Sequence, residues 1–513
     1  MKPLSNADNK TFSFQNDDKD IVCTPEKKPT NTKLYVHSLI GIAIMVVFQF
    51  LPAMGGITPI GMKMVGAFLG MVYLWSLVDT MWPSLLGLIF MGFSGFAGEG
   101  AEGMINTMLN AFGQHTVLLT LFCMVLFGAL YESGCTNYIA NWFLTRKIIT
   151  GRPYVFVGIF YAACYLLSTL ISPISSLLVM WPIALSLMEE LKIELCDKFW
   201  PYFFVGMFFV STIGQPLFPF MGAQLIVVSA FQSMSGTPVP YGQYMALNLI
   251  MCFILTLVYI LILKYIIRPD VSKLKAVDAE KIAAQNTLPP MNLQQKAFLI
   301  MLPVYIVLLL MPSFLPKTFP LVSTLSTLGP LGVTIVFVIF FSIIRFGSGP
   351  FLNFKEVAYG QLSWGIYFMI AAAVYGANGL SADATGVKTF LLSALNPILG
   401  GRSEMAFVAI MFTVALIITN FANNAAMAVV LMPVILAFSE QMNINPMPVA
   451  MGVGMMVFVA MLTPAASPHA GMMHGRKDIY TTGDIMRIGF PQCIATLIFY
   501  IFLGYPLAKL LFA

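Results

Sequence analysis

Asn420-Phe421-Ala422-Asn423-Asn424-Ala425-Ala426 places three amide side chains inside an apolar run that extends from about residue 405 to residue 438. Such a run is long enough to cross a bilayer as one helix. Amide groups in hydrocarbon are unfavourable unless they have partners, and transporters interrupt membrane helices at such points beside a cavity. We therefore predict that this stretch breaks a membrane helix and forms half of a site for a small molecule and a cation.

A second polar stretch occupies the matching position earlier in the chain. Gly151-Arg152 and Gly401-Arg402 each open an apolar run that ends in a proline. When those two prolines are aligned, Ser172-Pro173-Ile174-Ser175-Ser176 falls opposite residues 423–427. Interruptions at matching places of two halves are typical of transporter sites. The alternative is that the first stretch marks only a packed helix kink.

The composition is that of a polytopic membrane protein. Of the 513 residues, 58% are hydrophobic and 10% are charged, whereas soluble domains carry roughly 25% charged residues. The net charge of +5 gives no reason to expect a nucleic-acid partner. The seven cysteines are dispersed and have no CxxC spacing, so we expect them to be packing residues. No Walker, HExxH or nucleophile-elbow motif occurs, which argues against an ATP-driven pump and the commoner membrane enzymes.

The apolar runs divide the chain into four parts. Residues 1–33 are a polar tail that we expect to be disordered, and residues 34–267 hold an unpaired first span and a first repeat. Residues 268–296 form a connector, and residues 297–513 form a second repeat. The connector carries five Lys or Arg residues, so the positive-inside rule places it and the N-terminus in the cytoplasm.

The predicted fold class is an all-α polytopic membrane protein with about eleven transmembrane segments in two inverted repeats. We expect it to lie in the cell (cytoplasmic, inner) membrane. Residues 117–131 with 137–147, and residues 364–375 with 383–392, each read as two arms around a glycine-bearing break. Each pair is therefore predicted to form a re-entrant hairpin and an interfacial helix.

A further helix break is predicted in each half. The apolar segments 203–231 and 447–473 are both interrupted by proline and glycine, with Pro219 and Pro468 at corresponding places. Proline removes a backbone donor and clashes with the preceding turn, so the helix should unwind there. If the repeats are inverted, these breaks meet near the middle of the membrane.

The interruptions carry hydroxyls, amides and glycines, but no acid or base occurs in residues 154–188, 203–231 or 405–438. A cation would have to be held by hydroxyl, amide and carbonyl oxygens, which suits Na⁺. An anion would be held by backbone N–H groups at the N-termini of half-helices, where the helix dipole favours negative charge. His469 is the only ionisable side chain at a break, and a proton-coupled carrier usually needs such a group.

This organisation resembles the divalent anion–sodium symporter family, within the larger ion transporter superfamily. The resemblance rests on the duplicated interruptions and on Ile171-Ser172-Pro173, residues 421–425, residues 463–470 and residues 483–490. It extends over nearly the whole chain after residue 34.

The chain departs from the family at both helix breaks. The family typically carries Ser-Asn-Thr at each break, and only Ser172 and Asn424 match residue for residue. The family also often shows Pro-Pro-Asn near its other break, where this chain has Ser467-Pro468-His469. The resemblance implies an elevator transporter, usually a homodimer, that carries di- or tricarboxylates or sulfate with two or more Na⁺. By the same resemblance, Ser172 would be a Na⁺ ligand, and Asn424 would be shared by Na⁺ and substrate.

The motifs and the resemblance together give the full set of candidate site residues, with no catalytic residue among them. The predicted substrate-binding residues are Asn423, Asn424, Ser175, Ser467, His469 and Gln215. The predicted Na⁺ ligands are Ser168, Ser172, Gly214, Thr419, Asn424 and Thr463.

We therefore predict a secondary active transporter of small organic anions, di- or tricarboxylate-like, that is coupled to Na⁺ and works by elevator-type alternating access. Its expected partners are the anion, the lipid bilayer and a second copy of the chain. The alternatives within transport are an anion exchanger and a proton-coupled carrier, which a functional titration of His469 would favour. A channel fits the duplicated breaks less well, and an enzyme lacks a nucleophile–base–acid set.

Overall fold

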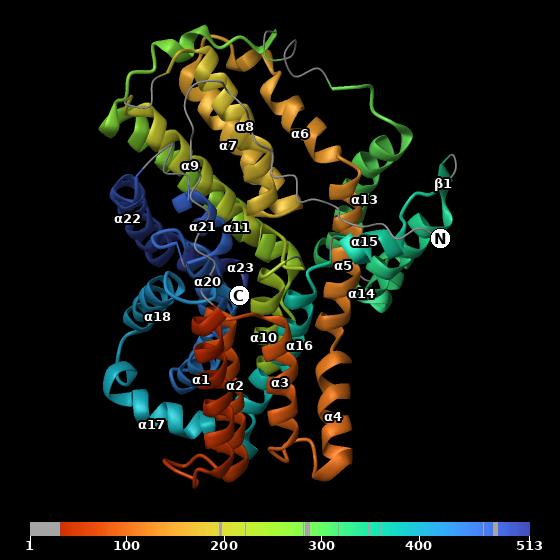
Figure 1. Ribbon diagram of the computed structural model, residues 1–513, viewed down its shortest axis with the longest axis vertical. Coiled ribbons are helices and arrows are strands. Elements are labelled where there is room, and N and C mark those ends of the chain that lie inside the picture. The colour runs from red at the N-terminus through yellow and green to blue at the C-terminus, as the bar shows by residue number, and fades with distance from the viewer. Residues whose placement is uncertain are drawn as a thin grey trace.

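The fold is built almost entirely from helices (Figure 1). The computed structural model describes residues 31–193, 197–220, 222–280, 282, 288–316, 318–346, 349–360, 362–464, 466–475 and 481–513. Most of the expected disordered tail, and Cys196, lie outside these residues. Helix α1 begins at Asn31, so the last three residues assigned to the tail belong to the first helix.

The first half of the chain is made of helices, and the first polar interruption separates α7 from α8. They are α1 (Asn31–Phe50), α2 (Pro59–Leu77), α3 (Met81–Gly92), α4 (Gly100–Phe112), α5 (His115–Glu132), α6 (Cys135–Leu144), η1 (Lys147–Ile149), α7 (Pro153–Leu170), α8 (Pro173–Glu190), α9 (Phe199–Gly214), η2 (Gln215–Leu217), α10 (Gln224–Ser235), α11 (Tyr241–Ile262), η3 (Leu263–Ile267) and η4 (Lys273–Ala276).

The second half contains the remaining helices and one short strand pair. The helices are α13 (Leu293–Phe314), α14 (Pro320–Ile343), α15 (Phe354–Gly360), α16 (Trp364–Ser381), η5 (Asp383–Thr385), α17 (Val387–Leu399), α18 (Glu404–Thr419), α19 (Asn424–Gln441), α20 (Pro446–Phe458), α21 (Pro468–Gly475), α22 (Thr482–Phe499), η6 (Tyr500–Gly504) and α23 (Tyr505–Leu511). Strand β1 (Arg345–Phe346) pairs antiparallel with β2 (Gly349–Pro350), with Arg345 opposite Pro350.

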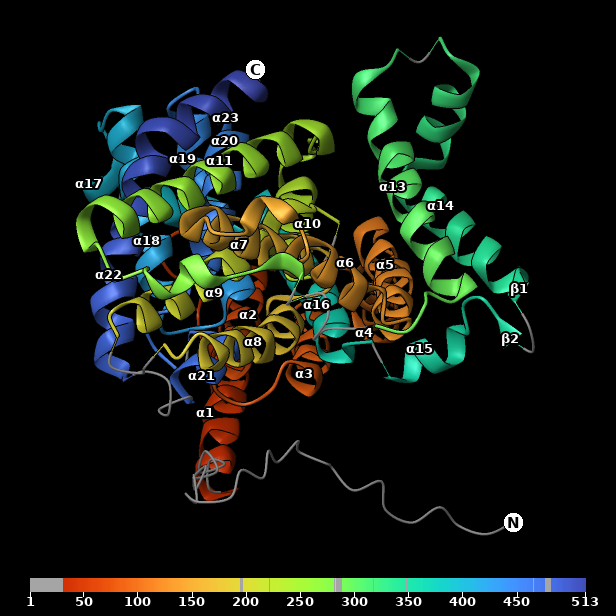
Figure 2. The same cartoon turned by 90° about the horizontal axis from the view of Figure 1, so that it is seen from above.

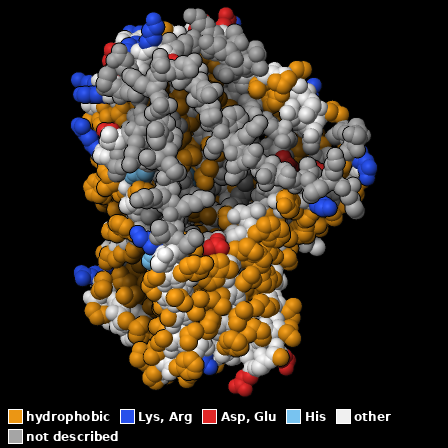
Figure 3. Space-filling model, in the orientation of Figure 1, with side chains coloured by type: hydrophobic (Ala, Val, Ile, Leu, Met, Phe, Trp, Pro, Cys, Tyr) orange, Lys and Arg blue, Asp and Glu red, His pale blue; other side chains and the backbone are white. Residues whose placement is uncertain are grey.

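The lengths and apolar character of the helices fit a membrane-spanning protein. Within the described residues, nine helices are long and apolar enough to cross a membrane, or up to eleven if each of two bent pairs counts as one span. Apolar side chains dominate the lower part of the face in Figure 3, and charged side chains gather at its margins. These observations confirm the predicted all-α polytopic membrane fold.

Two helix hairpins occupy the runs that the sequence suggested as single interrupted helices. In the first, α7 and α8 lie side by side (Figure 1), and Ser176 Oγ donates to the carbonyl oxygen of Cys164 over 2.9 Å. In the second, the rings of Phe407 in α18 and Phe438 in α19 have centroids 6.2 Å apart. Both contacts require that the chain reverses at the polar interruption. The prediction of one broken helix in each run was therefore wrong, and the polar residues form the tips of hairpins.

The hairpin predicted at residues 364–392 is also wrong, because α16 continues as a helix through Gly376-Ala377-Asn378-Gly379. The two glycines serve close packing instead of a break. A Cβ atom on Gly376 would collide with Met91 and Phe68, and one on Gly379 would collide with Met64. In the first half the expected break is present, since α5 ends at Glu132 and Gly134 turns the chain into α6 with φ +73°.

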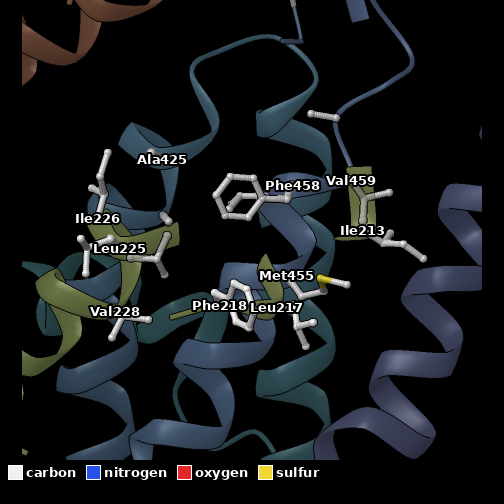
Figure 4. Packing of buried hydrophobic residues seen from close by; sticks show 14 of the residues in the cluster. Ile213, Leu217, Phe218, Leu225, Ile226, Val228, Ala425, Met455, Phe458 and Val459 are labelled. Carbon is white, nitrogen blue, oxygen red and sulfur yellow. The ribbon is translucent and has the colours of Figure 1, made fainter. Parts of the chain in front are cut away.

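The helix breaks predicted at residues 203–231 and 447–473 are present. In the first, α9 gives way to the 3₁₀ turn η2 before α10 begins, and in the second a loop separates α20 from α21. The two breaks pack against each other through buried apolar side chains (Figure 4), among them Ile213 and Leu217 of the first half and Met455 and Val459 of the second. Ala425 at the start of α19 packs beside α10, so the second hairpin tip reaches the first broken helix.

Helices α13 and α14 form a pair that stands beside the main body (Figure 2). The pair contacts the body mainly through α5 and α11, and it presents large exposed apolar side chains along its length. Exposed apolar helices of this length are suited to contact lipid or another membrane helix.

Candidate functional site

The first hairpin tip concentrates hydroxyl groups at the start of α8. Ser172 precedes the helix, and its Oγ accepts a hydrogen bond from the backbone N–H of Ser175 over 3.0 Å. Ser172 also donates to Ser175 Oγ over 3.0 Å. Pro173 suits the first helical turn, because its fixed φ is compatible with a helix start and its missing N–H needs no partner there.

The last turn of α7 connects this tip to the first broken helix. Ser168 Oγ donates to the carbonyl oxygen of Ser211, near the end of α9. Thr169 Oγ1 donates to the carbonyl oxygen of Gly214 over 2.9 Å. Both hydroxyl-bearing residues are buried. Hydroxyl and carbonyl oxygens from two elements therefore converge at the point where both helices end.

A cavity of about 320 Å³ opens beside this tip. It lies between the hairpin tip, the first helix break, α5 and the start of α16. It is lined by Thr120, Cys123, Met124, Phe127, Gly128, Tyr131, Ser168, Thr169, Ile171, Ser172, Ser175, Gln215, Phe220, Gly222, Ala223, Leu225, Ser363 and Ile366. No Asp, Glu, Lys, Arg or His is among these described lining residues.

The second hairpin tip repeats the pattern of the first with different side chains. Thr419 Oγ1, at the end of α18, donates to the carbonyl oxygen of Val457 in α20 and lies 3.0 Å from Asn424 Oδ1. Asn423 caps α19, because its Oδ1 accepts from the backbone N–H of Ala426 over 3.1 Å. Ser168 and Thr419 each stand four residues before the cap of the following helix, and each donates to a carbonyl of the neighbouring broken helix.

Asn420 holds the second tip to the second break. Its Oδ1 accepts hydrogen bonds from the backbone N–H groups of Met461 and Leu462 over 3.2 and 2.9 Å. Its Nδ2 donates to the carbonyl oxygen of Leu416 over 2.7 Å, and its own carbonyl accepts from Thr463 Oγ1. The side chain is buried, with 3% exposure. Asn420 therefore acts as a clamp between α18 and the unwound segment after α20.

The structure separates the predicted site residues into two groups. Ser168, Ser172, Ser175 and Gln215 line the cavity of the first half, where Gly214 contributes its carbonyl to Thr169. Thr419, Asn423, Asn424 and Thr463 surround the second tip and do not line that cavity. Helix α10, which follows the first break, packs against α19 and α20 and so connects the elements that carry the two groups.

Ser467 and His469 lie at the second break, and neither lines the cavity of the first half. Ser467 Oγ donates to the carbonyl oxygen of Ala460 over 3.2 Å and accepts from Ala470 N–H over 3.1 Å. The His469 ring packs on Phe208 of α9 with centroids 5.3 Å apart and is buried, with 5% exposure. Both side chains hold α21 in position within this structure.

Sequence reasoning missed three kinds of residue in the site. Asn420 was visible as an amide in an apolar run, but only its neighbours were assigned a role. In sequence, Thr169 looks like a threonine whose hydroxyl donates only to the preceding turn of its own helix. Its Oγ1 does lie 2.9 Å from the carbonyl oxygen of Tyr165, but it also contacts the carbonyl oxygen of Gly214 in the broken helix. Phe127 and Phe220 line the cavity, and no feature of the sequence distinguishes them from other apolar residues of their segments.

Comparison with known proteins supplies the family. The profile described as "Sodium:sulfate symporter transmembrane region" matches residues 32–513. The chain belongs to the sodium:sulfate symporter family. This result confirms the resemblance to divalent anion–sodium symporters. It also identifies the chain as an integral membrane transporter and not an enzyme.

Individual relatives of this family member are distant. It is 30% identical over 139 residues to "Uncharacterized transporter YfbS" of Escherichia coli K12, which covers 27% of this chain and 22% of that protein. It is 22% identical over 336 residues to "Uncharacterized transporter MJ0672" of Methanocaldococcus jannaschii, and this match covers 64% of this chain and 68% of that protein. It is 21% identical over 352 residues to "Sodium-dependent dicarboxylate transporter SdcS" of Staphylococcus saprophyticus, covering 66% of each chain.

The fold of this family member also matches a solved transporter. The YdaH transporter of Alcanivorax borkumensis, described as having an unusual topology, superposes with a TM-score of 0.52 at 15% identity. The match covers 93% of this chain and 97% of that one. At this identity the likeness concerns the fold alone.

Proposed function

We propose that this protein is a Na⁺-coupled secondary transporter of a small carboxylate-bearing anion. One observation carries the proposal: two corresponding oxygen clusters, around Ser168 and Thr419, lie where a hairpin tip meets the end of a broken helix. Both clusters consist of neutral oxygens from side chains and from the backbone. Such clusters suit a monovalent hard cation, whereas a proton carrier usually needs an ionisable side chain.

The residues present fit Na⁺ as a transported ion. The first cluster offers the hydroxyls of Ser168 and Thr169 and the carbonyls that they contact, at Ser211 and Gly214. The second offers Thr419 Oγ1, Asn424 Oδ1 and the carbonyl of Val457. Each carbonyl oxygen has two lone pairs, so a hydrogen-bonded carbonyl can still bind an ion. Among the described residues, no group of three or more His, Cys, Asp or Glu could hold a metal ion.

The anion would bind in the cavity of the first half. Ser175 and Gln215 provide hydrogen-bond donors there, and the N-terminus of α8 adds the positive end of its dipole. Di- or tricarboxylates are the first class to consider, because the name of the Staphylococcus saprophyticus relative includes dicarboxylate. Gln215 follows α9 directly, so an anion bound there also touches the first helix break.

Transport would proceed by elevator-type alternating access in a homodimer. The two hairpins and two broken helices would move together as one body, since Ser168, Thr419 and Asn420 tie each hairpin to its broken helix. The pair α13–α14 would belong to the stationary part and contact the second copy. Residues 34–267 would hold the unpaired first span and the first repeat, and residues 297–513 the inverted second repeat. The basic connector at 268–296 and the N-terminus would then face the cytoplasm, with the protein in the inner membrane.

Uptake into proteoliposomes tests the proposal. Labelled succinate, sulfate and monocarboxylates are offered with an inward Na⁺ gradient, against a K⁺ gradient at the same pH and against liposomes without protein. Na⁺-dependent accumulation of at least one anion is the expected result. Accumulation that is driven equally by K⁺ would overturn Na⁺ coupling and favour an exchanger or a proton-coupled carrier. No accumulation of any anion would overturn the transport proposal itself.

A further inference from the structure

Two different sets of elements bound the cavity beside the first hairpin tip. The hairpin tip and the first helix break form one side, and α5 with the start of α16 forms the other. The first side belongs to the body that would move in the proposed elevator, whereas α5 and α16 lie outside that body. The volume of about 320 Å³ is at the lower end of the range for ligand pockets, so a bound molecule would touch both sides.

Most hydroxyl groups of the lining are already used as donors within the protein. A hydroxyl has one O–H, so it cannot donate to a ligand while it donates to a carbonyl or to another hydroxyl. The engaged hydroxyls are those of Thr120, Ser168, Thr169 and Ser172. These side chains keep lone pairs for a cation, but they offer no free donor to an anion.

Four polar side chains of the lining retain a free donor. No described residue accepts a hydrogen bond from the Tyr131 hydroxyl, the Ser363 hydroxyl or the Gln215 amide. Ser175 Oγ accepts from Ser172 Oγ, and no described residue accepts from it in turn. The free donors therefore form two pairs. Ser175 and Gln215 lie on the hairpin side, and the second pair lies on α5 and directly before α16.

The second pair lies where α5 ends. Tyr131 is in the last turn of α5, and a Cβ atom on Gly360 would lie 3.7 Å from Glu132 Oε1, so the chain before α16 reaches the end of α5. Ser363 precedes α16, but its side chain makes no capping hydrogen bond. A serine at this position usually accepts a hydrogen bond from the helix backbone. The Ser363 hydroxyl is therefore available to a ligand.

Two separate pairs of donors suit an anion with a charged group at each end. A carboxylate accepts hydrogen bonds at both of its oxygens, so one pair of donors can serve one carboxylate. No cationic side chain lines the cavity among the described residues, and an unpaired charge is strongly disfavoured there. Each end of the anion consequently needs its own donors.

We propose that Tyr131 and Ser363 determine specificity for anions with two carboxylates, by binding the carboxylate farther from the hairpin tip. The nearer carboxylate lies at Ser175 and Gln215. The bound anion thus bridges the moving hairpin and the stationary α5 and α16, and it has to leave Tyr131 and Ser363 before the hairpin can move. This assignment rests on the proposed transport function and adds the residues that recognise the second end of the substrate.

Thermal unfolding of the full chain in nanodiscs, in Na⁺ buffer, measures anion binding without transport. Each two-ended anion is compared with the one-ended anion of the same length, succinate with butyrate and glutarate with pentanoate. We expect succinate or glutarate to half-saturate the protein at a concentration about tenfold below that of its one-ended partner. In the double variant Tyr131→Phe, Ser363→Ala, this ratio should fall to about one. Tyr202→Phe is the matched control, because it removes the same hydroxyl from α9 at a position that does not line the cavity.

Uptake kinetics test the bridging contact. The double variant should need about ten times more succinate for half-maximal uptake. Its maximal rate should equal or exceed that of the wild type, because the contact with α5 and α16 no longer has to break before the hairpin moves. A reduced maximal rate in a folded double variant would overturn the bridge.

The remaining outcomes separate this assignment from the proposed function. If the double variant keeps the wild-type ratio, or if Tyr202→Phe loses it as well, the assignment is overturned while Na⁺-coupled transport stands. If the double variant does not fold, Ser363→Asp places a negative charge at an exposed position of the second pair and should weaken succinate binding more than butyrate binding. Equal effects on both anions would overturn the assignment. If no anion of the panel binds and none accumulates in proteoliposomes, the assignment and the proposed function fail together.

Discussion

Thr419 Oγ1 lies 3.0 Å from Asn424 Oδ1, across the tip of the hairpin formed by α18 and α19. Asn424 is the first residue of α19, and Thr419 is the last residue of α18. The same threonine also donates to the carbonyl oxygen of Val457. Three oxygens, one each from α18, α19 and α20, therefore lie close together at the tip of the second hairpin.

Replacing Asn424 with alanine should abolish transport and leave a folded, membrane-inserted protein. The change removes one oxygen from the second cluster but leaves the cap at Asn423 and the clamp at Asn420 intact. Na⁺-driven uptake and size-exclusion profile in detergent are the measurements. Asn396→Ala, at an exposed position of α17, is the control and should transport normally. Wild-type uptake by Asn424→Ala would remove this residue from the site.

Removing a hydroxyl from either oxygen cluster should weaken Na⁺ dependence. Ser168→Ala and Thr419→Val each delete an oxygen that contacts a broken helix, so we expect the half-saturating Na⁺ concentration to rise about tenfold, the effect of roughly 1.4 kcal/mol. Thr419→Ser keeps the hydroxyl and should restore the wild-type value. Initial rates of uptake over a range of Na⁺ concentrations provide the measurement, and unchanged curves for both deletions would place Na⁺ elsewhere.

Asn420→Ala should destabilise the protein more than Asn424→Ala does. The loss leaves the buried N–H group of Met461 and the partly buried N–H group of Leu462 without their acceptor, which we estimate to cost about 2–4 kcal/mol. Thermal unfolding of the purified variants compares the two directly. Equal unfolding temperatures would show that the clamp contributes little to the stability of the second half.

The glycines of α16 provide a test of helix packing. Gly376→Ala should destabilise the fold by about 1–3 kcal/mol, because its Cβ would lie 2.8 Å from the ring of the buried Phe68 in α2. Gly158→Ala in α7 is the matched control, since its Cβ would meet only Ile260 at a distance of 3.7 Å. The control should be neutral or slightly stabilising. A neutral effect at Gly376 would instead favour a flexible break at this point.

His469 should not be the coupling group. It packs on Phe208, and no described residue hydrogen-bonds its Nε2 atom. We therefore expect His469→Gln to keep Na⁺-driven uptake and the same dependence of uptake on external pH as the wild type. Uptake measured between mildly acidic and mildly alkaline pH provides the comparison. A pH dependence that disappears in the variant would favour a proton-coupled carrier.

Polar residues within apolar runs were the features that sequence reasoning could locate. Ser168, Ser172, Ser175 and Gln215 were predicted for this reason, and all four line one cavity. Hydroxyls and amides in apolar segments need partners, so their positions reveal where helices end or meet.

Chain reversal at a tip was not predictable from the same features. A kinked span and a hairpin have the same apolar length and the same proline, and they differ only in contacts such as Phe407 with Phe438. The glycines of α16 were misinterpreted because glycine permits both a break and close packing. Phe127 could not be identified, because an aromatic residue looks alike in sequence whether it faces lipid, core or cavity.

The first residues of α8 and α19 differ in the hydrogen-bond donors that they can offer to a ligand. Pro173 has no N–H group, whereas Asn424 at the corresponding position has a backbone N–H and a side-chain amide. Two identical inverted halves would present the same side chains to each side of a membrane. The rates of ligand binding and release would then be the same on both sides. Pro173 is one of the differences between the two tips that remove this equivalence. With the halves inverted as proposed, the inward-facing and outward-facing carrier would hold its cargo with different lifetimes.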